Sequence, residues 1–272
     1  MDQPQLIGRG GTAEVYSWKK DQVLKLFFDW VPASWIWHEV ELAQRVSASS
    51  LPTPKFIEMT TYSNRSAIVY ERIDGDTMLR LISSRPWLVK SQARMLARLH
   101  AQINQESGVG LPSLHSDIRN RISTVQNLPD SLKGFALDIL DDLPDGKSLC
   151  HFDFHPDQVM VNSKGHLILD WMAALQGDPA ADVAHTSNLL TLARPPKTNW
   201  LIEMAIDAAR GAFFNSYKAE TIALRPDLNW EMVDRWRIPT AAARLGAGLA
   251  GEEAPISDFL KKELQKQRWH SH

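Results

Sequence analysis

The sequence has little of several features that mark particular classes of protein. Cys150 is its one cysteine, which excludes an intrachain disulfide and agrees with a reducing compartment. No apolar run reaches the roughly 18–20 residues that a membrane-spanning helix needs. The first residues lack the basic start and apolar run of a signal peptide. The formal net charge of −2 gives no general attraction to nucleic acid or anionic lipid. We therefore expect a cytoplasmic globular protein that binds neither nucleic acid nor membrane.

Hydrophobic residues make up 44% of the 272 residues, which is enough for a sizeable core. The first part of the chain consists of short apolar or β-branched runs separated by turn residues, with one helical pattern over 33–46. Beyond Asp74-Gly75-Asp76 helical patterns predominate, and a β-hairpin interrupts them, with predicted strands over 149–152, 159–161 and 167–170. We predict an α+β chain with a β-rich lobe over residues 1–73 and a mainly helical lobe over residues 74–272.

A glycine-rich stretch between two predicted strands is the first candidate site. It reads Gly8-Arg9-Gly10-Gly11-Thr12-Ala13-Glu14-Val15. Glycine lets the backbone approach an anion closely, and backbone amides can face phosphate oxygens. Glycines between strands more often form an ordinary turn, so the stretch predicts a phosphate site only in combination with other residues.

A lysine and a glutamate follow in the order that nucleotide binding needs. Lys25 lies in the apolar strand 23–28, and Glu39 lies on the predicted helix that comes next. A lysine that grips phosphate needs a carboxylate to hold it, and a helix packed on the sheet can supply one. Glu41 is two positions further along this helix and faces elsewhere. A lysine that simply points to solvent is the alternative explanation for Lys25.

Two aspartates at the ends of apolar strands carry the strongest signal. Asp153 belongs to the stretch Leu149-Cys150-His151-Phe152-Asp153-Phe154-His155-Pro156-Asp157-Gln158-Val159, and Asp170 ends the run Leu167-Ile168-Leu169-Asp170-Trp171. A charge in an apolar context needs a metal or a partner. In phosphoryl transfer one carboxylate meets the acceptor hydroxyl, while other oxygen ligands hold magnesium on ATP. The two aspartates are candidates for these two tasks.

In combination these motifs resemble the aminoglycoside phosphotransferase and choline kinase superfamily, which has a bilobal protein-kinase-like fold. The signature of that family is His-x-Asp-x-His-Pro-x-Asn, then a hairpin, then an aspartate followed by an aromatic residue. The matching residues are His151, Asp153, His155, Pro156, Asp170 and Trp171. The resemblance spans roughly residues 6–190. It implies an ATP- and magnesium-dependent kinase that phosphorylates a hydroxyl of a small molecule.

The resemblance implies a role for each candidate residue. Asp153 would be the catalytic base or orienting carboxylate, and Asp170 the main magnesium ligand. Lys25, supported by Glu39, would hold the α- and β-phosphates. Further nucleotide contacts would come from Gly8, Gly10, Gly11, Thr12 and Val15 and from the hinge residues Glu71 and Ile73. Within the catalytic loop, residues 149–171, His151 would brace the backbone together with Asp182, and His155 could lie near the acceptor.

The main departure from the family pattern is Gln158, which stands where the second magnesium ligand is asparagine. Its side chain is one methylene longer, and magnesium tolerates little distortion of its octahedron. A catalytically silent nucleotide-binding or regulatory module is therefore an alternative. Asn162 is not expected to replace Gln158, because it opens an Asn-Ser-Lys-Gly turn.

A metal-dependent hydrolase is a second alternative. His151, Asp153 and His155 alternate, so a strand would place them on one face, as a zinc site requires. Asp157 could add a fourth ligand. This hypothesis leaves the glycine-rich stretch unexplained, and Pro156 would end the strand.

The acceptor pocket is expected in the helices of residues 183–272. This region holds 12 Lys and Arg residues against 10 Asp and Glu, whereas a polycationic aminoglycoside would favour a cluster of acids. A neutral or anionic hydroxyl compound fits at least as well, and the sequence does not name it. Trp236 and Arg237 are the candidate acceptor contacts.

Overall fold

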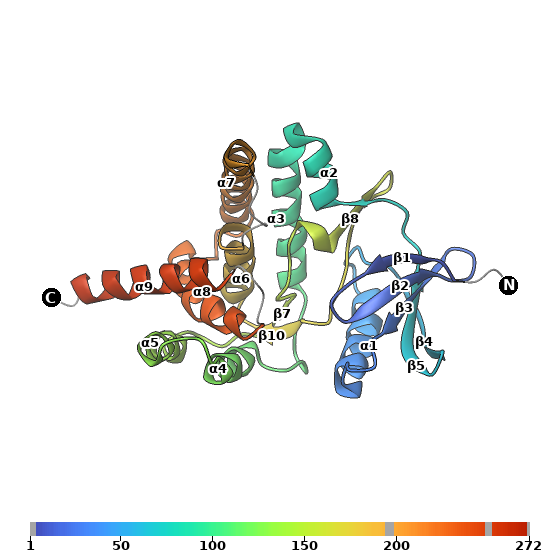
Figure 1. Ribbon diagram of the computed structural model, residues 1–272, viewed down its shortest axis with the longest axis horizontal. Helices are drawn as coiled ribbons and strands as arrows, with labels where there is room; N and C mark the ends of the chain where they lie inside the picture. Colours follow the sequence, from blue (N-terminus) through green and yellow to red (C-terminus); the bar gives the residue numbers. More distant parts are fainter. Residues whose placement is uncertain (1–3, 194–198, 248–251, 271–272) are drawn as a thin grey trace. The chain divides into compact units, whose positions relative to one another are not determined.

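The computed structural model describes residues 4–193, 199–247 and 252–270 (Figure 1). The outer ends of the predicted lobes and parts of the predicted acceptor region 183–272 lie outside the described residues. The chain forms two compact units, Met1–Leu81 with Pro156–Ala173, and Ile82–His155 with Ala174–His272. Within the described ranges, no helix combines the length and apolar character that crossing a bilayer requires.

The first unit is built on an antiparallel five-stranded sheet with the strand order β1-β2-β3-β5-β4. Tight turns connect its strands: Asp21, Ser63 and Asn64 have positive φ values of 58°, 50° and 62°, which short polar residues tolerate best. The elements of this part are β1 (Leu6–Arg9), β2 (Ala13–Ser17), β3 (Gln22–Phe27), α1 (Ala33–Ser47), β4 (Phe56–Tyr62) and β5 (Arg65–Glu71).

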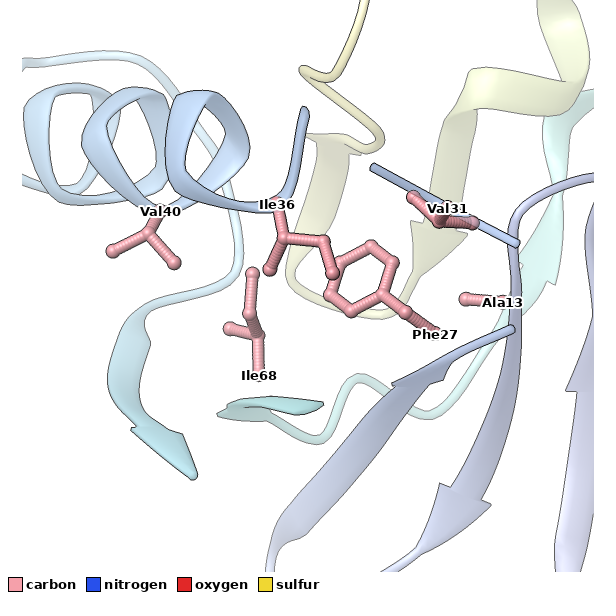
Figure 2. Close-up of a cluster of buried hydrophobic side chains, with 6 residues drawn as sticks. All are labelled: Ala13, Phe27, Val31, Ile36, Val40 and Ile68. Carbon is pink, nitrogen blue, oxygen red and sulfur yellow. The ribbon is translucent and has the colours of Figure 1, made fainter. Parts of the chain in front are cut away.

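Helix α1 packs on one face of this sheet. Figure 2 shows Ile36 and Val40 pointing from the helix toward Phe27 and Ile68 of the strands. Successive strand residues face opposite sides, so Leu24 and Leu26 belong to a separate apolar cluster. The cluster under α1 comprises Ala13, Phe27, Val31, Ile36, Val40 and Ile68. This packing turns alternate residues of β3 toward the helix.

A second, three-stranded sheet completes the first unit. It joins β6 (Asp76–Thr77), β8 (Val159–Asn162) and β9 (Gly165–Ile168) in the order β6-β8-β9. The backbone at Gly75 passes so close to β8 that a Cβ there would lie 2.4 Å from the Val161 carbonyl oxygen. As expected for a turn residue, the Asn162 side chain accepts from the amides of Lys164 (2.8 Å) and Gly165 (3.1 Å).

The compact units divide the chain differently from the predicted lobes 1–73 and 74–272. The pairing of β6 with β8 ties the hairpin of residues 159–168 to the β-rich unit, although it follows the first helices in sequence. The predicted catalytic loop, residues 149–171, therefore contributes to both units. A lobe boundary near residue 74 stays a prediction.

The second unit is mainly helical. Helix α2 (Met78–Ser84) leads into it from the first unit. Helix α6 (Pro179–Thr191) is buried along most of its length, and the Asp178 carboxylate caps its start by accepting from the Ala180 amide at 2.7 Å. The other helices are α3 (Val89–Gln105), α4 (Leu114–Thr124), α5 (Asp130–Asp141), α7 (Trp200–Leu224), α8 (Trp230–Arg244) and α9 (Glu253–His270), with short 3₁₀ turns at Pro86–Leu88 and Leu245–Ala247.

The α+β fold expected from the sequence is confirmed, and the pairing of one strand differs from expectation. Strand β7 (Ser148–Cys150) pairs with β10 (Leu175–Gly177) in a sheet of two strands. The sequence pattern extends this strand to Phe152, but Phe152 has a φ of 56°, which ends the extended backbone. Strand β10 has three residues, too few for an alternating pattern to show.

Candidate nucleotide and catalytic site

Lys25 lies between two carboxylates within the first unit. Its Nζ is 2.6 Å from Glu39 Oε1 and 3.1 Å from Asp170 Oδ1. The Tyr70 hydroxyl donates to the same Glu39 oxygen at 3.1 Å. The contacts join strands β3 and β5, helix α1 and the segment after β9. The structure therefore brings together Lys25 and Glu39, as predicted, and adds Asp170 and Tyr70.

Burial and charge act in opposite directions in this cluster. Burial by itself lowers the pKa of Lys25, but the charges of Asp170 and Glu39 outweigh it and raise that pKa above its usual value. Glu39 is 2% exposed, and its burial raises its pKa against the opposing effect of Lys25. Burial, and then the charge of Glu39, raise the pKa of Tyr70, which keeps its hydroxyl protonated as a donor. Lys25 is a cation with a fixed position.

The glycine-rich stretch forms the turn between β1 and β2, beside Lys25 in the sheet. Gly8 is opposite Val15, and Val15 is opposite Lys25 in the strand pairing. The Gly10 amide donates to the Ala13 carbonyl at 2.9 Å, and the Thr12 carbonyl accepts from Phe28 at 3.0 Å. A Cβ added at Gly11 would meet nothing within 4 Å. The packing of the protein therefore does not require glycine at position 11. The open space beside this residue would let a ligand approach the backbone.

Asp170 has a strained backbone that its neighbours hold in place. Its φ is 55°, a left-handed conformation that a non-glycine residue rarely adopts. The preceding Leu169 amide donates to the Gln158 carbonyl at 2.8 Å, and the following Trp171 donates through Nε1 to Thr53 at 3.2 Å. The side chain of Asp170 is 42% exposed. The backbone of Gln158 is thereby tied to the residue before Asp170, so the two predicted magnesium ligands belong to one unit.

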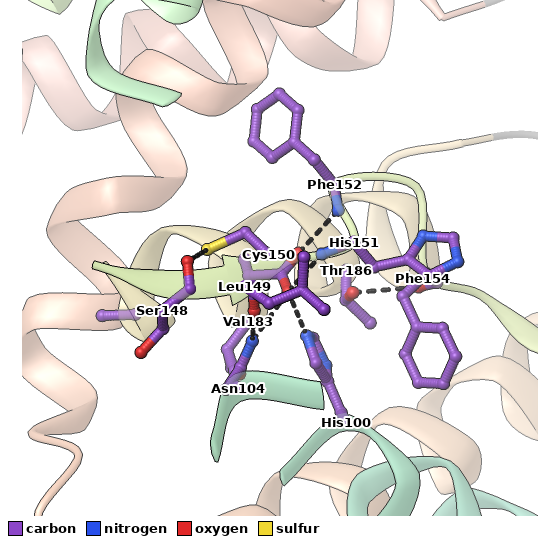
Figure 3. A network of polar contacts seen from close by, with 12 residues as sticks. His100, Asn104, Ser148, Leu149, Cys150, His151, Phe152, Phe154, Val183 and Thr186 are labelled. Atoms are coloured by element: carbon purple, nitrogen blue, oxygen red, sulfur yellow. Dashed lines mark hydrogen bonds and ion pairs between the residues drawn. The ribbon is translucent and has the colours of Figure 1, made fainter. Parts of the chain in front are cut away.

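In the second unit, a buried carboxylate holds the backbone just before Asp153. Asp182 accepts from the amides of His151 and Phe152, both at 2.9 Å. Asn104 Nδ2 donates to Asp182 at 2.9 Å, and His100 Nε2 lies 2.9 Å from it. Figure 3 shows His100 and Asn104 reaching from α3 toward this loop, with the Phe152 ring directed away from them. The predicted bracing of the loop by Asp182 is visible in these contacts.

Asp182 stays ionised although it is fully buried. Burial by itself raises its pKa, but His100, the Phe152 amide and Asn104 hold it below the usual range of an aspartate. Neutralising Asp182 would leave the two backbone amides that it binds without a strong acceptor. The Thr186 hydroxyl adds a further contact by donating to the Phe154 carbonyl at 2.9 Å. The residues on both sides of Asp153 are therefore fixed from helix α6.

The histidines around Asp153 differ in exposure. Asp153 is 36% exposed and His155 is 29% exposed, with Nε2 of His155 3.9 Å from Asp153 Oδ2. His151 is fully buried. Across the ranges that the structure describes, no group of three or more His, Cys, Asp or Glu side chains is arranged to hold a metal ion. The alternating histidines and Asp153 thus form no zinc site there, and Asp157 adds none.

His185 packs on Phe152 from helix α6. The two rings stack with their centroids 4.3 Å apart and their planes 26° apart. The Arg121 guanidinium also lies over the Phe152 ring, 5.7 Å from its centroid. Burial, followed by the charges of Arg244 and Arg121, lowers the pKa of His185 to about 3. His185 is therefore a neutral ring at physiological pH.

The remaining predicted site residues lie in two places. Glu71 ends β5, where its amide donates to the Lys55 carbonyl at 2.9 Å, and Ile73 follows that strand. Trp236 is 1% exposed in the core of the helical unit. The Arg237 guanidinium donates to Asn188 (3.0 Å) and Thr191 (2.9 Å). Trp236 and Arg237 thus pack between helices, and we do not carry them into the acceptor site proposed below.

The family model described as the phosphotransferase enzyme family matches residues 7–220, which include both the Lys25 cluster and the Asp153 loop. The chain belongs to this phosphotransferase family. No curated protein matches the sequence.

Solved structures of kinases share the fold of this phosphotransferase family member. A putative fructosamine-3-kinase from Haemophilus somnus has a TM-score of 0.63 at 11% identity, over 96% of this chain and 90% of that one. The aminoglycoside phosphotransferase APH(3'')-Id from Streptomyces rimosus, in complex with ADP and streptomycin, has a TM-score of 0.57 at 15% identity, over 88% and 92%. The GDP complex of an aminoglycoside 2'-phosphotransferase-IIIa variant has a TM-score of 0.56 at 14% identity, over 98% and 92%. The protein-kinase-like fold expected from the motifs is confirmed.

Sequence reasoning missed three groups that support the site of this phosphotransferase. Tyr70 contacts Glu39, His100 contacts Asp182, and His185 stacks on Phe152. Each contact joins residues on different elements, so no local pattern marks it. His100 and Asn104 do share one face of a predicted helix that is otherwise apolar, which is a weak signal for a buried polar network.

Substitutions at Phe152 test whether the backbone before Asp153 is strained. In the left-handed region a side chain costs about 1 kcal/mol or more relative to glycine. We expect Phe152→Gly to be more stable than Phe152→Ala by about 0.5–1 kcal/mol, although both lose the packing of the ring. Phe154 does not have this backbone conformation, so Phe154→Ala should be more stable than Phe154→Gly. Urea unfolding of the four variants checks this, and the same order at both positions would contradict a strained Phe152.

The neutral His185 predicts a pH dependence of stability. The pKa of His185 is about 3 in the folded protein and 6.5 for an unperturbed histidine. Between these two pH values the unfolded chain therefore binds a proton at His185 and the folded chain does not. The stability linked to neutral His185 is complete above pH 6.5 and falls with decreasing pH, by at most about 1.4 kcal/mol per pH unit. Between pH 6.5 and 4.5, His185→Phe should lose stability less steeply than the parent protein in urea unfolding. Parallel curves would show that His185 protonates in the folded state.

Proposed function

We propose that the protein is an ATP- and magnesium-dependent kinase that transfers the γ-phosphate to a hydroxyl of a small molecule. The observation that carries the proposal is the position of Lys25 between Glu39 and Asp170. Glu39 holds the buried lysine from helix α1, and the more exposed carboxylate of Asp170 lies beside it. This arrangement suits the binding of a phosphate group together with its cation. The lysine can bind phosphate oxygens while the exposed carboxylate binds the cation that accompanies them.

The first unit supplies the groups for the nucleotide in this proposal. The turn of Gly8, Gly10, Gly11 and Thr12, with Val15 behind it, offers backbone amides to the phosphates. Lys25, anchored by Glu39, neutralises the α- and β-phosphates. The backbone at Glu71 and Ile73 offers hydrogen bonds to the base. ADP and GDP in the complexes of the two aminoglycoside phosphotransferases agree with a nucleotide in this fold.

The residues present fit magnesium. Asp170 offers a partly exposed carboxylate, and Gln158 offers an amide oxygen on a segment tied to the backbone before Asp170. Magnesium prefers oxygen ligands and takes the remaining ones from phosphates and water, so two protein side chains suffice. When bound, the ion would neutralise charge on the phosphates. The Gln158 carbonyl accepts from the Leu169 amide, which fixes the backbone from which its longer side chain extends.

Asp153 would act on the acceptor. Its carboxylate orients the acceptor hydroxyl and takes up its proton as the hydroxyl oxygen forms a bond to the γ-phosphorus. The bond between the γ-phosphorus and the β–γ bridging oxygen breaks, and ADP leaves with that oxygen. The proton passes from Asp153 to solvent. Asp182 keeps the backbone before Asp153 in place, and His155 lies close enough to contact the acceptor.

The acceptor is a small hydroxyl compound, and the charges do not favour an aminoglycoside. Streptomycin is bound by one of the solved aminoglycoside phosphotransferases, but two carboxylates of the helical unit, Asp182 and Glu252, already have partners. Asp182 accepts from backbone amides, and Glu252 pairs with Arg244 at 2.6 Å. The expected acceptor region 183–272 has 12 Lys and Arg against 10 Asp and Glu, which does not favour a polycation. We propose that the reaction takes place in the cytoplasm, where ATP and magnesium are available.

Two alternatives make different predictions. A silent nucleotide-binding module, suggested by Gln158, would bind ATP without turning it over. A metal-dependent hydrolase built on His151, Asp153 and His155 would need a cluster that the described residues do not form. Both candidate aspartates are present in the chain, which favours the kinase over the silent module.

Calorimetric titration with ATP, with and without magnesium, tests the proposal. We expect magnesium-dependent binding that is lost in Asp170→Ala and kept in Asp153→Asn and in the control Asp157→Ala. With a library of hydroxyl compounds, Asp153→Asn should turn over ATP at least a hundredfold more slowly than the parent protein. ATP binding without turnover would support the silent module, and no ATP binding would contradict the proposal.

A further inference from the structure

Phe152 is held by more than the hydrogen bonds of its backbone. Asp182 fixes the amides of His151 and Phe152, but these bonds do not restrain the Phe152 side chain or the peptide that leads into Asp153. A bulky residue at a φ of 56° stays there only where its surroundings determine its position. The Phe152 ring is 3% exposed, so its surroundings are protein side chains.

Helix α6 provides a contact for each part of Phe152. Asp182 and His185 are three positions apart on this helix and therefore lie on the same face. Asp182 binds the backbone of Phe152, and His185 stacks on its ring with a centroid distance of 4.3 Å. This distance and the angle of 26° are those of a close aromatic stack. One rigid helix thus orients both the backbone and the side chain of the residue before Asp153.

The face of the His185 ring makes a contact, whereas its buried Nδ1 makes none with the part of the chain that the structure describes. His185 is 5% exposed, and its Nδ1 is buried with no hydrogen-bond partner among the residues described. Its low pKa means that the ring is neutral, so the stack does not depend on a charge on the imidazole. A histidine that acts by acid–base chemistry needs an accessible nitrogen near neutral pKa. The features of His185 match a flat packing surface instead.

We propose that His185 is a positioning residue for phosphoryl transfer, which sets the place of Asp153 by stacking on Phe152. The inference rests on the proposed function. Without the ring of His185, Phe152 loses a contact that balances its strained backbone, and it can relax to an ordinary conformation. The peptide into Asp153 then rotates. A shift of about 1 Å in a reacting group can lower the rate a hundredfold.

Two substitutions separate this role from others. His185→Ala removes the stack, while His185→Phe keeps a flat ring and removes the unpartnered nitrogen. We expect His185→Ala to lower kcat for magnesium-dependent ATP hydrolysis at least tenfold with KM for ATP unchanged within twofold, because the proposed nucleotide contacts belong to the other unit. His185→Phe should keep kcat within twofold of the parent protein. Its Tm should equal or exceed that of the parent.

His115→Ala is a control for general destabilisation of the helical unit. His115 contacts the Leu140 carbonyl (2.8 Å) and the Trp236 ring rather than Phe152 or Asp182, so its loss should lower Tm without lowering kcat. Equal loss of kcat in His185→Phe and His185→Ala would overturn the inference, as would full activity of His185→Ala. A parent protein that binds magnesium-ATP but transfers phosphate neither to water nor to any compound of the hydroxyl library would instead contradict the proposed function, and this inference with it.

Discussion

The position of Lys25 between Glu39 and Asp170 is the constraint on which the nucleotide half of the site depends. The charges of both carboxylates offset the cost of burying the cation and together raise the pKa of Lys25. The arrangement requires α1 to lie on the sheet face toward which alternate residues of β3 point. It also requires the hairpin of β8 and β9 to belong to the same unit as that sheet. The apolar cluster under α1 meets the first requirement, and the pairing of β6 with β8 meets the second.

The catalytic half depends on a second buried charge. Asp182 does for the loop of Asp153 what Glu39 does for Lys25, since each is a buried carboxylate that holds a neighbouring group in one position. Strain accompanies both arrangements. Phe152 and Asp170 each adopt a left-handed backbone directly before or at a predicted functional aspartate. Strain of this kind persists where packing and hydrogen bonds balance it, and here they are supplied by α6 in one unit and by Thr53 and Gln158 in the other.

The sequence predicts the order of the elements well and their long-range pairing poorly. The helix of Glu39 and the strand of Lys25 follow from local periodicity, and their contact follows from the family resemblance. The assignment of the 159–168 hairpin to the first unit depends on β6, a strand of two residues, and no pattern marks so short a strand. The same applies to Tyr70, His100 and His185, whose partners lie on other elements. Trp236 is a different case, because the tryptophan chosen as a candidate acceptor contact is buried in the core of the helical unit.

The most direct test of the account is the affinity for magnesium-ATP of Glu39→Gln compared with Glu41→Gln. Both substitutions remove one charge from α1, but Glu39 is buried against Lys25 whereas Glu41 is exposed. The account predicts that Glu39→Gln weakens magnesium-ATP binding at least tenfold in calorimetry, and that Glu41→Gln leaves it unchanged within twofold. Equal affinities in the two variants would contradict the claim that the buried pair holds Lys25 for the nucleotide.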